Sequence, residues 1–223
     1  MAELNRMVPR VVDATSTSAL FTMAHLIESV PVRLDAVEAI IVMPGLGEHA
    51  RLQAAVSAWE AHPHIQYLIV AGTNDIEKTQ PQPSLEFLES SLIGLHRTEG
   101  VITQVSAEHT KDQTDWIAHT LRDKKIQSAA LFVSHWHLPR AYGTLLKSMD
   151  ELHVKLALFP VAVGTSPTAV VPETGQTVIA MSAGEAKRIS TYQELGHVTS
   201  LDELEYYLAW LWQQKIAPIH ANY

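Results

Sequence analysis

Residues 37–59 read VEAIIVMPGLGEHARLQAAVSAW, and this stretch contains one complete unit of the predicted fold. The apolar run at 37–43 is typical of a short buried strand, and the PGLG sequence at 44–47 favours a turn. Apolar residues then follow at helical spacing through 52–59. The stretch therefore predicts a strand, a turn that contains two glycines, and a helix in immediate succession.

The same strand-and-helix unit recurs along the chain. Apolar runs predict further strands at 67–70, 101–105, 129–133 and 154–159, and helical spacing predicts helices over 85–92, 110–121 and 139–149. Strict alternation of short buried strands with helices indicates βαβ units, whose right-handed crossovers place helices on both faces of a parallel sheet. We therefore predict an α/β fold, a three-layer Rossmann-like domain with a mainly parallel sheet of about five strands.

Further helical segments flank this core, which spans about 37–163. The spacing of apolar residues predicts an N-terminal helix at about 14–30 and a C-terminal helical segment at about 181–216. No repeat, low-complexity tract or clear linker divides the chain. We therefore expect residues 1–223 to form a single domain.

The C-terminal segment is less regular than the core. Residues 164–175 are rich in Thr, Pro, Val and Gly and predict a long loop, followed by helices at 182–192 and 200–216. Ser200 and Glu203 have the spacing of a capping box at the start of the second of these helices. The aromatic residues of that helix are expected to cover the core, and contact with a second subunit in a homodimer is the alternative.

Composition excludes several classes of function. The chain has no cysteine, which removes disulfides, zinc–thiolate sites and cysteine nucleophiles. It carries 16 basic and 24 acidic side chains, a formal net charge of −8, which argues against a nucleic-acid partner. No apolar run approaches the roughly 20 residues of a membrane span, and no secretory signal is recognised at residues 1–10. We therefore expect a cytoplasmic protein that acts on a small molecule, with no membrane partner.

The chemistry is expected at one edge of the sheet. In an open parallel sheet, ligands bind beyond the carboxyl ends of the strands, so the loops that follow the strands should meet there. These loops are residues 44–51, 72–75, 106–112 and 134–140, and three of the four contain histidine. Their convergence predicts a binding pocket.

The loop at 134–140, SHWHLPR, carries the largest share of candidate groups. If the chain is extended there, His135 and His137 project to the same side. Either histidine could act as a general acid or base near neutral pH. An H-x-H pair without a third ligand of known spacing does not define a metal site, so we assign no metal ligand. Ser134 and Arg140 are expected to contact a ligand, the arginine because it lies unfavourably at a helix start and suits an anion. A surface arginine paired with an acidic residue is the alternative.

The other loops supply the remaining candidates. Gly45 and Gly47 would let the backbone approach an anionic ligand at a helix start, with Arg51 adding charge, although the spacing alone slightly favours an ordinary strand-to-helix turn. The pattern T-x-x-Q at 110–113 has the form of a capping box, which would make Thr110 a helix cap. Further residues expected to face the pocket are Gly72, Asn74, Glu108, His109, Thr110 and Asp112.

Four motifs in order resemble the YdcF-like family, which includes SanA and ElyC. The family shows a strand that ends in a glycine turn with an arginine shortly after, and this chain has residues 40–45 with Arg51. A strand ending Ser-Gly-Gly corresponds to 69–73, a Thr-x-Glu-Asn element to 110–113, and Ser-Pro-Tyr-His-Met-x-Arg-Ala to 134–141. The resemblance covers roughly residues 37–163. This chain departs from the pattern at Ala71, Thr73, Asp112, Gln113 and His135.

The resemblance implies a Rossmann-like domain whose pocket is lined by the two glycine turns, Arg51, Thr110, His137 and Arg140. It also implies S-adenosylmethionine as a candidate ligand, because one member of the family binds it. SanA and ElyC carry a membrane anchor, and this chain shows none. The added His109 and His135 indicate a substrate of its own.

Three hypotheses for function follow. The first is an enzyme acting on a small anionic molecule, nucleotide-like or phosphorylated, by histidine acid/base chemistry: His137 acts with His135 or His109, and Asp112 or Glu108 orients a partner. The second is a module that binds S-adenosylmethionine or a nucleotide without catalysis. The third is a metal-dependent hydrolase built on His135, His137 and an acidic residue.

Overall fold

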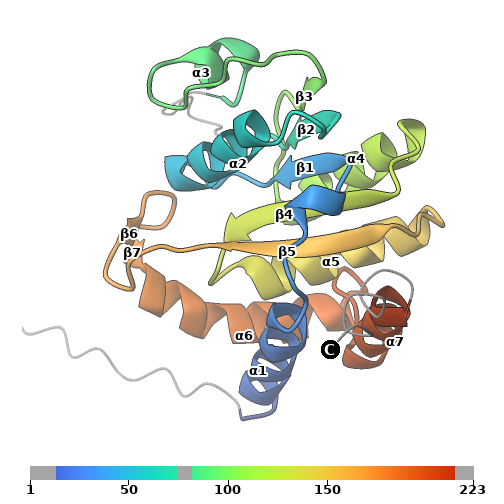
Figure 1. Ribbon diagram of the computed structural model, residues 1–223. Coiled ribbons are helices and arrows are strands. Elements are labelled where there is room, and N and C mark those ends of the chain that lie inside the picture. The colour runs from blue at the N-terminus through green and yellow to red at the C-terminus, as the bar shows by residue number, and fades with distance from the viewer. Residues whose placement is uncertain (1–13, 75–81, 214–223) are drawn as a thin grey trace, which may run out of the picture.

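A five-stranded, all-parallel sheet forms the centre of the computed structural model, which describes residues 14–74 and 82–213 (Figure 1). Its strands are β1 (Ala39–Val42), β2 (Tyr67–Val70), β3 (Val101–Thr103), β4 (Ser128–Ser134) and β5 (Ala157–Val163). They lie in the order β3-β2-β1-β4-β5, so the chain reverses its direction of winding between β1 and β4. The predicted fold class is thereby confirmed.

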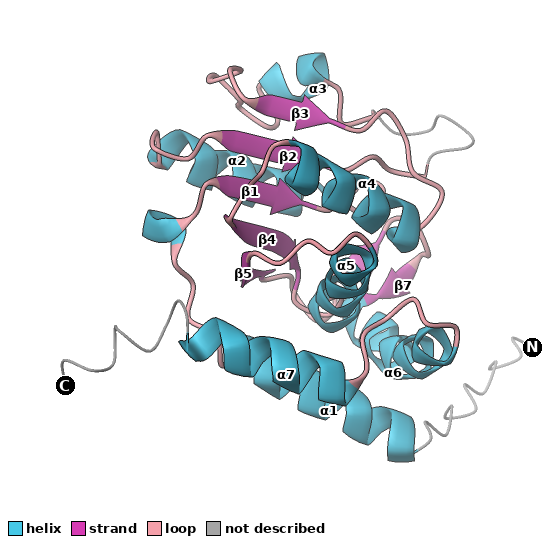
Figure 2. Ribbon diagram, turned by 90° about the vertical axis from the view of Figure 1, so that its right-hand side faces the viewer, coloured by secondary structure: helices cyan, strands magenta, loops and turns pink. Residues whose placement is uncertain are grey.

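Helices cover both faces of this sheet, which explains why its central strands are continuous apolar runs. Every residue of β1 and of β4 is buried. The helix α2 (His49–Ala61) packs on one face, and α4 (Thr110–Asp123) and α5 (Leu138–Glu151) pack on the other (Figure 2). The short helix α3 (Leu85–Glu89) and a 3-10 turn at Leu34–Ala36 complete the connections.

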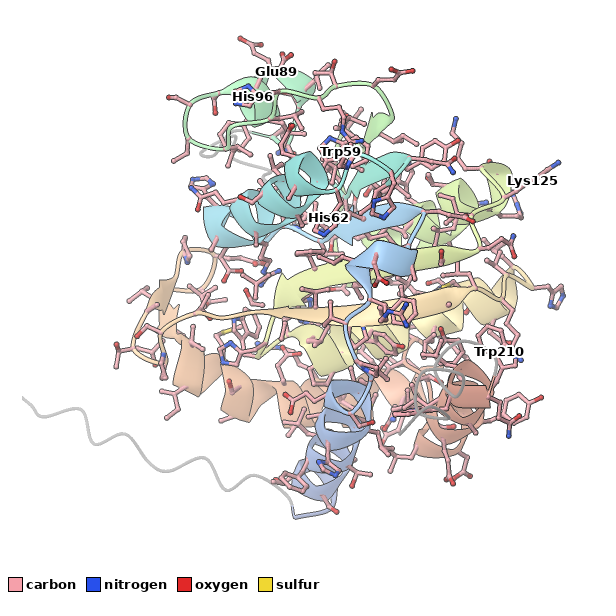
Figure 3. The ribbon with its side chains drawn as sticks, in the orientation of Figure 1. Trp59, His62, Glu89, His96, Lys125 and Trp210 are labelled. Carbon is pink, nitrogen blue, oxygen red and sulfur yellow. The ribbon has the colours of Figure 1, made fainter. Side chains whose placement is uncertain are left out.

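Three more helices pack beside α5 and the β5 edge: α1 (Ala14–Glu28), α6 (Val178–Glu194) and α7 (Leu201–Leu211) (Figures 1 and 2). The predicted capping box of α7 is present, with Ser200 and Glu203 each accepting the other's backbone N–H. Tyr207 of α7 is buried, and its hydroxyl contacts β5. Trp210 and Trp212 are partly buried against the core, as predicted, whereas Tyr206 is exposed. Trp210 lies on the same helix (Figure 3).

The structure corrects several predicted boundaries. The segment 164–175 is not all loop, because β6 (Val170–Val171) pairs with β7 (Gln176–Thr177) in a small hairpin. Gly175, with φ of 64°, closes the turn in a conformation that favours glycine. Strand β5 starts and ends later than the predicted 154–159, and α6 begins at Val178 instead of 182. Residue 75 of the second loop and the predicted end of the last helix, 214–216, lie outside the described residues.

Two side chains illustrate how the remaining connections are held. Trp59, which Figure 3 labels, lies at the end of α2 and donates its indole N–H to the carbonyl of Arg97. The guanidinium carbon of Arg97 lies 3.3 Å from the centroid of the indole ring. Arg97 also donates to the carbonyl of Trp59, so the connection between α3 and β3 is fixed to α2.

Among the described residues, none of the helices combines the length and the apolar character that crossing a bilayer requires.

Candidate functional site

A cleft opens where the loops after β1 and β4 diverge, at the reversal point of the sheet where ligands bind in folds of this type. Its volume is about 200 Å³. Eight of the residues expected from sequence line it: Gly45, Arg51, Asn74, Glu108, His109, Thr110, His137 and Arg140. The cleft also takes residues from the β6–β7 hairpin, which lies beyond the end of β5 in Figure 1, and from α6.

Arg51 joins the two central loops at the floor of this cleft. Its Nε donates to the Ser134 hydroxyl at 2.7 Å, its Nη1 donates to the carbonyl of Met43 at 2.9 Å, and its Nη2 pairs with Glu48. The side chain is 3% exposed, and burial lowers the pKa of the guanidinium from its usual range. A Cβ on Gly45 would collide with the Glu48 carboxylate, so the glycine makes room for this ion pair. Arg51 therefore fixes the loops and brings positive charge to the cleft.

His137 is the buried histidine of the cleft, whereas His109 lines it from an exposed position. His137 lies just before α5 without a side-chain capping hydrogen bond, is 6% exposed, and has its Nδ1 3.6 Å from the Oε2 of Glu185. Burial, together with the nearby Arg140, lowers the pKa of His137 to about 4. The imidazole is therefore neutral at pH 7. With Nδ1 facing Glu185, Nε2 on the opposite side of the ring is the nitrogen left for a ligand.

Glu185 is the centre of the charge network behind the cleft. Its carboxylate accepts two hydrogen bonds from Arg140, at 2.6 and 3.3 Å, and one from Arg188 at 2.9 Å. Burial alone would raise the pKa of this 1%-exposed carboxyl, but His137 and Arg140 outweigh it and lower the pKa to about 2. Arg140 also donates to the Thr110 hydroxyl at 2.9 Å. One buried anion thus orients two arginines and one histidine.

The loop before α4 differs from the sequence prediction. His109, not Thr110, caps α4, because its Nδ1 accepts the backbone N–H of Asp112. Thr110 is the first residue of the helix, and the side chain of Gln113 donates to the carbonyl of Gly72 instead of closing a capping box. Asp112 does not line the cleft, and its carboxylate accepts the backbone N–H of Glu108.

His135 does not reach the cleft either. The chain turns directly after β4, with the backbone N–H of His137 donating to the carbonyl of Ser134, so the extended conformation that would align the two histidines is not formed. The ring of His135 lies near the hydroxyl of Thr165 instead. Within residues 14–74 and 82–213, no group of three or more His, Asp or Glu side chains is arranged to hold a metal ion.

Three other predicted ligand contacts lie around the cleft and not on its wall: Gly47, Gly72 and Ser134. Ser134 is fully buried and accepts from Arg51, and Gly47 lies in the turn before α2 with φ of 71°. Gly72 is needed for close packing, because a Cβ there would lie 2.6 Å from the backbone of Ser106. Asn74 does line the cleft, and its side chain donates to the carbonyl of Glu108.

Ten lining residues were not among the individual candidates. Five of them belong to loops that were expected at the cleft: Pro44, Leu46, Thr73, Ala107 and Trp136. The sequence argument missed the other five altogether: Gln113, Glu173, Thr174, Met181 and Arg188. Glu185, behind the wall, escaped as well, although one signal was available: it lies on the apolar face of α6 with Met181 and Ile189, where a carboxylate is costly unless it is paired. No signal indicated that the β6–β7 hairpin would bring Glu173 to the cleft.

A larger cavity, of about 310 Å³, lies between α5, α7 and the residues that precede β5. It lies at the edge of the sheet opposite to the carboxyl ends of the strands. None of the site residues expected from sequence lines it. Its size therefore does not make it the preferred site.

Comparison of the chain with models of known protein families and with curated proteins finds no match.

Proposed function

We propose that the cleft is the active site of a small-molecule enzyme of the YdcF-like family, in which His137 acts as a base on a substrate that carries an anionic group. The observation that carries this proposal is a neutral, buried imidazole in the cleft with a buried carboxylate opposite its Nδ1. Convergence of Gly45, Arg51, Thr110, His137 and Arg140 on one cleft supports the family assignment, because these are the positions that the family motifs select.

The pair formed by His137 and Glu185 suits proton abstraction. A carboxylate facing Nδ1 favours the tautomer with a proton on Nδ1, which leaves the lone pair of Nε2 free to accept a proton from the substrate. The same carboxylate would then stabilise the imidazolium. A base with a pKa of about 4 is weak, but a bound anion next to the ring would raise that pKa towards neutrality. Substrate binding would therefore switch the base on.

The charges around the cleft favour an anionic substrate. Arg51, Arg140 and Arg188 line it. The two carboxylates that pair with them, the partly buried Glu48 and the buried Glu185, leave one of these three positive charges in excess. The acids on the rim, Glu108 and Glu173, are exposed, so water weakens their effect. Arg188 is the arginine best placed to change partners, because its side chain is 39% exposed. A phosphoryl or carboxylate group would complete this arrangement.

The proposal is tested first by a thermal-shift screen of nucleotides, adenosyl compounds and sugar phosphates, with product analysis of every compound that stabilises the protein. We then expect His137→Gln to bind the substrate but to lose about 10²–10⁴-fold in turnover. The matched control is His135→Gln, which changes a histidine two positions away that does not line the cleft.

The outcomes separate the hypotheses. Full activity of His137→Gln would remove the assignment of the base. Binding without any conversion by the wild-type protein would instead favour a module that binds S-adenosylmethionine or a nucleotide.

A further inference from the structure

A second, smaller cavity adjoins the cleft on the far side of Arg140. Its volume is about 130 Å³, and it shares His109, Thr110 and Arg140 with the cleft. Its own lining residues are Lys111, Thr144, Tyr192 and His197. The Arg140 side chain, hydrogen-bonded to Thr110, therefore forms a wall common to both spaces.

Two aromatic rings lie side by side in this second cavity. Helix α6 ends at Glu194, and Gly196, with φ of 73°, folds the chain back so that the backbone N–H of His197 donates to the carbonyl of Tyr192 at 2.8 Å. This fold brings the His197 and Tyr192 rings to a centroid distance of 6.2 Å and an interplanar angle of 20°. Both side chains are only partly buried, so parts of them stay accessible beside the cavity.

Charge and aromatic surface meet at Arg140. Its guanidinium carbon lies 5.8 Å from the centroid of the Tyr192 ring, while its nitrogens bind Glu185 and Thr110 on the side of the cleft. A ligand whose anionic group lies near Arg140 and Arg188 would thus have an aromatic surface within reach of its next few atoms. Flat rings pack favourably on aromatic and guanidinium faces.

We infer that the substrate carries a planar ring close to its anionic group, and that the Tyr192–His197 pair binds this ring in the second cavity. The inference rests on the proposed function, because the anion in the cleft sets the position of the ring. Thr110 and Arg140 then contact the ligand between its two parts. Tyr192 and His197 are binding residues for the ring and take no part in the chemistry.

The test compares two phosphate monoesters that differ only in the group beside the anion. Calorimetry should show that phenyl phosphate binds the wild-type protein about tenfold more tightly than methyl phosphate. Tyr192→Leu and His197→Ala should each reduce this preference, while Tyr192→Phe, which retains the ring, should keep it. The control is Leu195→Ala, an exposed apolar residue at the end of the same helix that lines neither cavity. Thermal unfolding confirms that each variant is folded.

The results distinguish the two proposals. Equal affinity of the wild-type protein for both esters would overturn the ring site and leave the anion site in place. A phenyl preference that survives both Tyr192→Leu and His197→Ala would have the same meaning. If neither ester bound, the inference and the anionic substrate of the proposed function would fall together. Arg188→Met should weaken both esters by the same factor, because Arg188 lines only the cleft.

Discussion

His137 makes the stability of the protein sensitive to mild acid. Its folded pKa of about 4 lies below the ordinary value of 6.5, so between these values the unfolded chain binds a proton that the folded chain does not. Protonation of His137 therefore does not reduce the free energy of unfolding well above pH 6.5, and it reduces this free energy increasingly as the pH drops towards 4. The physical cause is burial, reinforced by Arg140 and Arg51, which outweighs the attraction of Glu185.

Between pH 7 and pH 5, the free energy of unfolding of the wild-type protein should fall by about 2 kcal/mol more than that of His137→Gln. The reason is that most of the range between the folded and unfolded pKa values of His137 lies between these two pH values. Urea denaturation of both proteins at the two pH values measures this difference. The other histidines are common to both proteins, so the difference isolates His137. Stabilities that fall by the same amount in both proteins would mean that His137 is protonated normally in the folded state.

At the scale of secondary-structure elements, β5 depends on a tyrosine from α7. β5 is an edge strand, and the hydroxyl of Tyr207 accepts the backbone N–H of Leu158 and donates to the carbonyl of Leu156. We expect Tyr207→Phe to cost about 1–3 kcal/mol, because these buried groups would lose their partner. Urea denaturation measures the loss, and Tyr206→Phe is the matched control, since Tyr206 is 73% exposed. Equal stability of both variants would contradict the role of Tyr207.

The start of α4 offers a second test at this scale. His109 caps the helix and Thr110 is its first residue, so His109→Ala should destabilise the protein by about 1 kcal/mol. Thr110→Ala should have a smaller effect on the helix, although it removes the acceptor that Arg140 uses. Thermal unfolding of the two variants ranks them. The opposite order would restore the capping box that the T-x-x-Q pattern predicts.

These elements show what the sequence could and could not predict. The strands β1, β2 and β4 were predictable because burial on both faces makes them continuous apolar runs. The β6–β7 hairpin was not, because two residues in each strand leave no periodicity to detect. The position of the α4 cap depends on the backbone angles of His109, which a pattern of residue types does not determine.

At the scale of the whole molecule, topology explains why part of the site was predictable. Parallel strands carry their loops to one edge, so Gly45, Thr110 and His137 could be placed together without any knowledge of side-chain contacts. Arg188, Glu185 and Glu173 come from the segment after β5, whose path over that edge depends on how α6 packs against α1 and α5. His135 and Asp112 were wrongly expected in the cleft, because a turn or a local hydrogen bond directs each elsewhere.

A ligand at the reversal point of the sheet should act on segments far apart in the chain at the same time. We expect phenyl phosphate to slow amide hydrogen exchange together in the loops at 44–48, 107–110 and 134–140 and in the hairpin at 170–177, because all of them line the cleft. The larger cavity is the internal comparison: its residues at 146–155 and 199–207 should exchange at an unchanged rate. Protection confined to those two segments would place the ligand between α5 and α7, and protection of a single loop would mean that the four segments do not form one site.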